Sequence, residues 1–334
     1  MRLNSVIPRL RGYMGMWGGL LLWGAALCVQ AAGLRTIEIP AESDGQGRAF
    51  KAAVWSPCAQ AAQAIALGPF VLQGVRDCPL PPGVHPLVLV SHGHAASALS
   101  HHDTAQALAD AGFIVAALNH PGDTATDMHS SGDMAALQRR PADVRRLLDH
   151  LLRHPGLAAH IDAQRVGFFG FSRGGFTGLV LGGARPDFVQ AGLPCPDASA
   201  PLCAQMRDSR FTPGPWVHDS RFKALVIADP LNAFPGPRSL RAVQAPVQLW
   251  WSQQGGDGVL PERVAALAED LPVRPEVHQV EGATHFAFLA PCPPALAQAQ
   301  PGICRDGPGF SRAAFHQTFN AQVLVFLRQH LAPH

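Results

Sequence analysis

The chain has 334 residues and a formal net charge of +2; 47% of its residues are hydrophobic and 15% are charged. Neither of its two lysines, Lys51 and Lys223, follows a glycine, so a P-loop is excluded, and its single tyrosine, Tyr13, lies in an apolar N-terminus, where it cannot serve a short-chain dehydrogenase. The small net charge gives no electrostatic footprint for nucleic acid, and the high apolar content excludes disorder.

The N-terminus has the pattern of a secretory signal. Arginines precede an apolar run over residues 14–29, and a small-residue cleavage site follows it. We expect residues 1–32 to be a signal peptide and residues 33–334 to form a single domain that is periplasmic or secreted, with no stable membrane span after signal removal. An uncleaved membrane anchor is the alternative, although the run is short for a span.

Buried strands alternate with helices along the remainder of the chain. Short apolar runs predict strands over residues 34–40, 49–55, 86–91, 113–118, 166–171, 224–228, 247–252 and 276–280. Helical spacing and caps predict helices over residues 104–111, 142–154, 173–182, 261–271 and 311–331. This alternation predicts an α/β fold, with a mostly parallel, doubly wound sheet covered on both faces.

Residues 183–222 interrupt the alternation and are rich in Pro, Asp and Ser. We predict a lid-like insertion over the top of the sheet, with a disordered loop as the alternative. Phe211, Trp216 and Phe222 in this segment are candidates to line an apolar acyl pocket. Alternatively, these aromatic side chains only anchor the loop.

Six cysteines follow the predicted signal, and their even number fits an oxidising compartment. Pairing between neighbours in the sequence predicts the bridges Cys58–Cys78, Cys195–Cys203 and Cys292–Cys304, among fifteen possible connectivities. None of the spacings is typical of a zinc site.

The sharpest chemical signal is the segment Gly170-Phe171-Ser172-Arg173-Gly174-Gly175. It contains Gly-x-Ser-x-Gly between a predicted strand and a predicted helix, the context in which a serine is held on a tight, strained turn. The flanking glycines leave room for that turn. We predict Ser172 as a nucleophile, with an ordinary turn and an exposed serine as the alternative.

The segment Ser91-His92-Gly93-His94 follows an earlier predicted strand. In such an arrangement this loop supplies one backbone N–H to stabilise an oxyanion, and the residue after the nucleophile supplies the second. We assign these donors to His94 and Arg173, with Gly93 allowing the backbone to approach. Metal binding by these histidines with His101, His102 and Asp103 is the alternative.

The base is expected after the last strand, and His285 has this placement, following the predicted strand and a glycine turn. The third group is an acid at a strand end between the serine and the histidine, which holds the imidazole tautomer. Asp257 and Asp229 both qualify. We favour Asp257, because the loop after the penultimate strand is the usual source; a surface histidine and a structural aspartate are the alternatives.

At these residues the chain resembles the α/β-hydrolase superfamily, and more narrowly the bacterial dienelactone-hydrolase-like group related to cutinases and platelet-activating-factor acetylhydrolases. The resemblance runs from about residue 86 to residue 291 and also rests on Asn119-His-Pro-Gly-Asp123 and Arg140-Pro-Ala-Asp-Val144. It implies an α/β-hydrolase fold. Similarity to cutinases points to Asp257 as the acid, and similarity to the acetylhydrolases points to Asp229. True dienelactone hydrolases have a cysteine where this chain has Ser172, and the insertion departs from the compact cutinase pattern.

These observations predict a secreted serine hydrolase that cleaves carboxylic esters through an acyl-enzyme intermediate, with a Ser-His-Asp triad. The expected substrate is a small-molecule or lipid-like ester, and neither a cofactor nor a metal is implied. The alternatives are a non-catalytic binding protein with the same fold, and a serine peptidase or amidase.

Overall fold

The computed structural model describes residues 31–333 except 44, 46, 195–200 and 209–213. The predicted signal peptide therefore lies almost wholly outside the described residues and stays a prediction. Its last two residues, Ala31 and Ala32, are buried at the start of the first strand. In the described part of the chain, no helix is long and apolar enough to cross a membrane.

The described residues form a ten-stranded sheet in the order β10-β9-β8-β7-β5-β6-β2-β1-β4-β3. The strands are β1 (Ala31–Ile39), β2 (Phe50–Cys58), β3 (Gln63–Leu67), β4 (Phe70–Arg76), β5 (His85–Ser91), β6 (Ile114–Leu118), β7 (Ile161–Phe171), β8 (Phe222–Ala228), β9 (Val247–Ser252) and β10 (Glu276–Val280). All neighbours from β10 to β6 are parallel, whereas β2 is antiparallel to both β6 and β1. The sheet is thus mostly parallel, as predicted.

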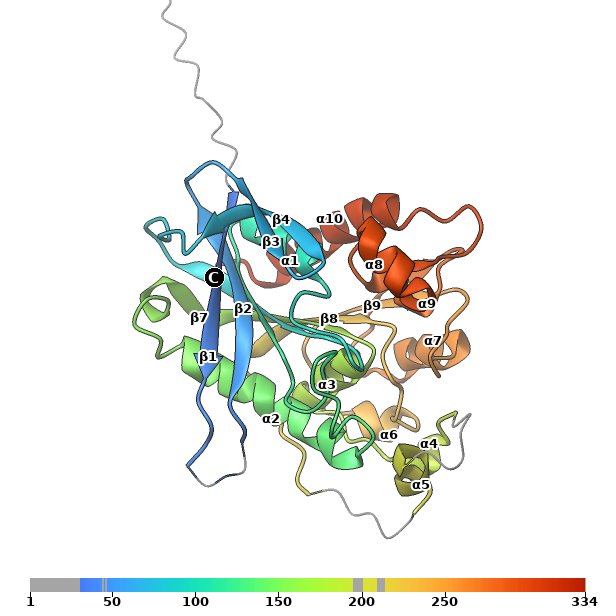
Figure 1. Cartoon of the computed structure of the whole chain (residues 1–334). Helices are drawn as coiled ribbons and strands as arrows, with labels where there is room; N and C mark the ends of the chain where they lie inside the picture. Colours follow the sequence, from blue (N-terminus) through green and yellow to red (C-terminus); the bar gives the residue numbers. More distant parts are fainter. Residues whose placement is uncertain (1–30, 44, 46, 195–200, 209–213, 334) are drawn as a thin grey trace, which may run out of the picture.

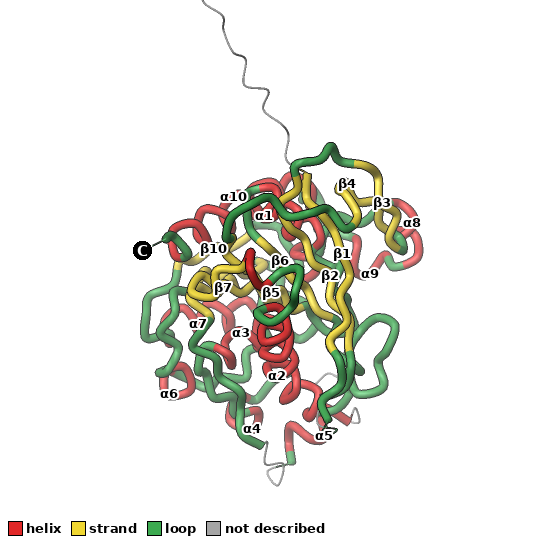
Figure 2. Tube along the Cα trace, turned by 90° about the vertical axis from the view of Figure 1, so that its left-hand side faces the viewer, coloured by secondary structure: helices red, strands yellow, loops and turns green. Residues whose placement is uncertain are grey.

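Helices cover both faces of this sheet, with α1 and α10 on one face and α2, α3 and α7 on the other (Figures 1 and 2). The helices are α1 (His102–Asp110), α2 (Met134–Leu151), α3 (Arg173–Leu181), α4 (Phe188–Ala191), α5 (Pro201–Arg207), α6 (Pro237–Leu240), α7 (Pro261–Asp270), α8 (Pro294–Ala299), α9 (Pro301–Cys304) and α10 (Arg312–His330), with 3₁₀ turns η1 (Ala158–His160) and η2 (His285–Phe288). Each face has its own apolar core. All residues of β6 are consequently buried, because a strand covered on both sides has no solvent face.

A hairpin and the start of one helix are examples of where the structure differs from the sequence-based expectations. The strands β3 and β4 form a hairpin that the alternation of strands and helices did not predict. Helix α2 begins at Met134 rather than at residue 142, because Asp133 caps it and Pro141 lies inside the helix instead of opening it. The predicted start followed from the apolar residues that recur from Val144 onward, so the first two turns of α2 were missed.

The structure contains the predicted bridges Cys58–Cys78 and Cys292–Cys304. The first joins the end of β2 to the segment after β4, and the second joins the segment after η2 to the end of α9. The predicted partner of Cys203, Cys195, lies outside the described residues, and Cys203 is itself disulfide-bonded. Two of the three predicted pairs are therefore confirmed.

Candidate active site

Ser172 occupies a strained turn between β7 and α3. Its backbone has φ 55° and ψ −117°, a conformation that residues with a side chain rarely adopt. The neighbouring strand β8 stabilises this strained conformation, because the Ser172 amide donates to the carbonyl oxygen of Ala228 at 3.0 Å. A turn of this type directs a serine hydroxyl away from the sheet, as predicted for a nucleophile.

Glycines allow three segments of backbone to meet at this turn. A Cβ atom on Gly174 would lie 1.8 Å from the carbonyl oxygen of Ser91, and one on Gly170 would lie 2.2 Å from the carbonyl oxygen of Gly174. A Cβ on Gly93 would lie 3.3 Å from Cβ of Ser172. The loop after β5 therefore passes directly beside Ser172, where the oxyanion donor was expected.

His285 pairs with Asp229. The His285 Nδ1 atom lies 3.0 Å from Asp229 Oδ2, and both side chains are almost completely buried. Ser252 fixes the carboxylate, since its amide donates to Asp229 Oδ1 at 2.8 Å and its hydroxyl donates to Oδ2 at 2.5 Å. An ionised carboxylate accepts hydrogen bonds only, so Nδ1 of His285 carries the proton in this pair.

The preference for Asp257 is therefore corrected by the structure, which places the alternative acid, Asp229, in contact with His285. Among the described residues, no hydrogen bond joins Asp257 to His285, and Asp257 is exposed. The cause is strand order, because β8, which Asp229 follows directly, lies beside β7 and its serine turn. The loop before Asp257 instead supports the backbone of His285, whose amide donates to the Gly255 carbonyl oxygen at 2.8 Å.

The second ring nitrogen of His285 is available for chemistry. Its Nε2 atom is buried and has no hydrogen-bond partner among the described residues. The ring packs against Phe171, the residue that precedes Ser172, with 4.6 Å between ring centroids. With the proton of the pair on Nδ1, Nε2 is the ring nitrogen that could accept a proton, and it lies in a ring packed against the residue before Ser172.

The two backbone amides that were predicted as oxyanion donors belong to His94 and Arg173. Arg173 opens α3, where a helix provides no acceptor for the first N–H groups. In the described part of the chain, the His94 amide donates to no protein group. Burial and then the charge of Arg173 lower the pKa of His94, while Asp123 and Asp257 oppose the shift.

The Arg173 side chain belongs to a buried ion cluster. Asp123 Oδ2 accepts from Arg140 Nη1 at 2.6 Å and from Arg173 Nη1 at 3.1 Å. Although burial raises the pKa of the Asp123 carboxyl, the two guanidinium groups hold it below its ordinary value. Arg173 also donates to the carbonyl oxygen of Ser131 at 2.9 Å. The first residue of α3 is therefore held at its side chain, which limits movement of its amide.

Sequence reasoning assigned no role to Asp123 or Arg140, nor to His120 and Asp143 beside them. All four belong to the two segments, 119–123 and 140–144, that contributed to the family resemblance. The available signal was the helical spacing of α2, which places Arg140 and Asp143 on the same buried face as Val144 and Leu147. Charged residues on an apolar face indicate a buried polar network.

Three of the four histidines of the alternative metal site each make a hydrogen bond to a different backbone carbonyl oxygen. His92 Nδ1 donates to the Gly93 carbonyl oxygen at 2.7 Å, His101 Nδ1 to that of Phe288 at 3.1 Å, and His102 Nδ1 to that of Leu99 at 2.9 Å. Within the described ranges, no group of three or more His, Cys, Asp or Glu side chains is arranged to hold a metal.

The helices α4 and α5 of the insertion lie near the starts of α7 and α2, and two aromatic residues of the insertion pack inward. Arg263 of α7 donates to the Ala191 carbonyl oxygen at 2.6 Å, and Gln205 accepts from the amide of Met134, the first residue of α2. The Trp216 ring packs on Phe176, and Phe222 on the core residue Phe168. These contacts support the alternative in which Trp216 and Phe222 anchor the segment, and Phe222 also borders the hollow described below; Phe211 lies outside the described residues.

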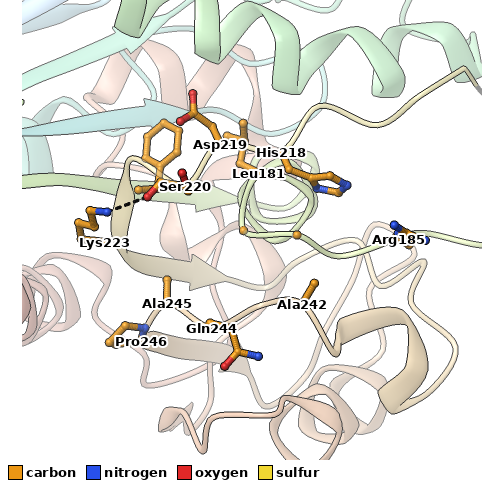
Figure 3. Close-up of a pocket in the computed structure, with 13 residues that line it drawn as sticks. Leu181, Arg185, His218, Asp219, Ser220, Lys223, Ala242, Gln244, Ala245 and Pro246 are labelled. Atoms are coloured by element: carbon orange, nitrogen blue, oxygen red, sulfur yellow. Dashed lines mark hydrogen bonds between the residues drawn. The ribbon is translucent and has the colours of Figure 1, made fainter. Parts of the chain in front are cut away.

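A hollow of about 590 Å³ lies at the opposite edge of the sheet (Figure 3). It is bordered by Phe222 and Pro246, where β8 and β9 begin, and by Leu181 at the end of α3. Ser172 and Asp229 follow the other ends of their strands. This hollow is therefore not part of the candidate active site.

Comparisons with known proteins agree with this architecture. The model of the family described as serine aminopeptidase, S33, matches residues 83–219. A solved structure of a ferulic acid esterase from Streptomyces cinnamoneus is similar with a TM-score of 0.61 at 18% identity, over 92% of this chain and 91% of that chain. No curated protein matches. The chain has the α/β-hydrolase fold, as predicted, whereas the narrower resemblance to dienelactone-hydrolase-like proteins stays a prediction.

Proposed function

We propose that the protein is a serine hydrolase that cleaves carboxylic esters through an acyl-enzyme intermediate. The observation that carries the proposal is the buried Asp229–His285 pair, which leaves Nε2 of His285 unpartnered beside the strained turn of Ser172. A serine on a strained turn, a histidine with an unpartnered ring nitrogen and an acid that orients this histidine are the groups that this chemistry requires. The whole-chain similarity to a ferulic acid esterase supports an ester as the substrate.

In this proposal the Ser172 hydroxyl attacks the acyl carbon and gives its proton to His285 Nε2. Asp229 holds the ring in the productive tautomer and stabilises the imidazolium. The amides of His94 and Arg173 stabilise the oxyanion of the tetrahedral intermediate. The imidazolium then protonates the leaving alcohol, and water, activated by the same histidine, releases the acid from Ser172.

A serine peptidase is the second candidate, because the matching family model describes aminopeptidases. The two candidates are separated by comparing hydrolysis of p-nitrophenyl esters with that of peptide anilides by wild type and Ser172→Ala. We expect esters to be cleaved by wild type alone, and anilides far more slowly. Anilide cleavage at a rate equal to or above ester cleavage would favour the peptidase.

We also propose that the protein is periplasmic or secreted. The two bridges support this, because disulfides persist mainly in oxidising compartments. N-terminal sequencing of protein recovered from outside the cytoplasm tests this proposal. A mature chain that begins near residue 33 is expected, whereas an intact Met1 on cytoplasmic protein would contradict it.

A further inference from the structure

A second serine–histidine–aspartate chain lies behind the loop that follows β5. Ser91 Oγ is 2.9 Å from His120 Nε2, and His120 Nδ1 is 3.1 Å from Asp143 Oδ2. Ser91 is 0% exposed and His120 is 1% exposed, so no acyl group can reach this serine. The chain is therefore not a second catalytic centre, and its buried polar groups require another explanation.

Arg140 sets the direction of the hydrogen bonds in this chain. A guanidinium group only donates, and Arg140 Nη2 lies 3.4 Å from Ser91 Oγ. With its oxygen accepting from Arg140, Ser91 donates its proton to His120 Nε2. His120 then carries its proton on Nδ1 and donates it to the Asp143 carboxylate. When Asp143 is ionised, each donor along the path from the Arg140 guanidinium to the Asp143 carboxylate therefore meets an acceptor.

The same groups hold the backbone beside Ser172. Arg140 Nη2 also donates to the carbonyl oxygen of His92. The His120 amide donates to His92 Nε2 at 3.2 Å, so His92 is neutral, and burial followed by the charge of Arg140 lowers its pKa to about 3. The carbonyl oxygen of Ser91 is the atom that excludes a side chain at position 174. Residues 91–93 are thus fixed from behind by Arg140 and His120.

We propose that Ser91, His120 and Asp143 are positioning residues that, through Arg140, fix the loop carrying the His94 amide for stabilisation of the oxyanion. The inference rests on the proposed function, because it assigns that amide to the tetrahedral intermediate. Its physical basis is preorganisation, since a donor that is already in place costs no reorganisation as charge develops.

The chain also makes the loop sensitive to pH. Burial raises the pKa of Asp143 to about 7, opposed by Arg146, Arg140 and Arg139 and assisted by Glu42. A protonated Asp143 can donate to His120 Nδ1, which moves the histidine proton to Nε2. Both Arg140 and His120 then donate to Ser91, and the Ser91 hydroxyl loses its acceptor. Protonation of Asp143 therefore breaks the hydrogen-bond path that joins Arg140 to Asp143 through Ser91 and His120.

The test compares Ser91→Ala with Ser56→Ala, a matched control. Ser56 is equally buried, and its hydroxyl has no partner among the described residues. For a p-nitrophenyl ester, we expect Ser91→Ala to lower kcat about tenfold with little change in KM, less than the loss of an oxyanion donor. A trifluoromethyl ketone, which forms a tetrahedral adduct on Ser172, should bind about tenfold more weakly. Ser56→Ala should change neither value.

Asp143→Asn is the second variant, because it preserves shape if Ser91→Ala does not fold. We expect the kcat of this variant at pH 8 to be lower than that of wild type. The part of the decrease in kcat at acid pH that protonation of Asp143 causes in wild type should be absent from the variant. Folded variants with wild-type kcat, wild-type ketone affinity and a wild-type pH profile would overturn the inference. Wild type that a fluorophosphonate does not label at Ser172 would instead remove the proposed function itself.

Discussion

Replacing Asp229 by Asn separates the two candidate acids, because the structure dictates how the new amide sits. The Ser252 amide donates to Oδ1 of Asp229 and requires an acceptor there. The oxygen of the new side chain therefore takes the Oδ1 position, and its NH₂ group takes the Oδ2 position, 3.0 Å from His285 Nδ1. One N–H then donates to Ser252 Oγ and the other to His285.

This arrangement forces the wrong tautomer on His285. Its Nδ1 must accept, so the proton moves to Nε2, which can no longer take a proton from Ser172. The analogous aspartate-to-asparagine change in serine proteases lowers kcat by about 10⁴, equivalent to about 5 kcal/mol of transition-state stabilisation. We expect a loss of this order for Asp229→Asn, and a change within about twofold for the exposed Asp257→Asn.

The assay is steady-state hydrolysis of a p-nitrophenyl ester by both variants, with circular dichroism to confirm that each one is folded. The difference between the variants is the informative quantity, since both remove one carboxylate charge near the site. If Asp257→Asn loses most activity and a folded Asp229→Asn retains it, the assignment of Asp229 is wrong.

Three further predictions concern stability, measured by thermal or urea unfolding. Gly174→Ala should lower the free energy of unfolding by about 3 kcal/mol or more, the size found for severe overpacking. The reason is that the new Cβ atom would lie 1.8 Å from a backbone oxygen. Gly132→Ala is the control, because the new Cβ would enter open space and should be tolerated. Burial raises the folded-state pKa of Asp143 to about 7, so its native state binds the proton more tightly and stability should fall as pH rises from about 4 to about 7. Asp143→Asn should flatten that slope, and an unchanged slope would contradict the assignment. Replacing Cys292 and Cys304 together by Ser should lower stability by about 3 kcal/mol, and an unaltered melting temperature would show that this bridge does not constrain the fold.

The alternation of apolar runs was sufficient to predict the strands of the sheet other than β3 and β4, the coverage of the sheet on both faces and the placement of Ser172 after β7. Each of these depends on local pattern and on the strand-to-helix context. The acid was harder, because Asp229 and Asp257 both follow a strand and precede His285. Only the spatial order of the strands places β8 beside β7, and no local pattern of residues encodes that order.

The polar network behind the site was also missed, although the helical spacing of α2 gave a signal for it. Arg140 and Asp143 lie in a helix rich in arginine, where charged residues usually face solvent. Their burial depends on how α2 packs against β5 and α3, a tertiary property. Likewise, Trp216 was compatible with either a pocket wall or an anchor, and its edge-on packing against Phe176 follows from a fold of the insertion that composition does not specify.

The most direct test of the central claim is labelling by a fluorophosphonate, read by intact mass and by peptide mapping. We expect one adduct on native wild-type protein, located on Ser172. The label should be absent from Ser172→Ala and from wild type denatured beforehand, because reactivity depends on the assembled His285 and oxyanion donors. Native wild type that remains unlabelled, or an adduct that persists in Ser172→Ala, would contradict the account.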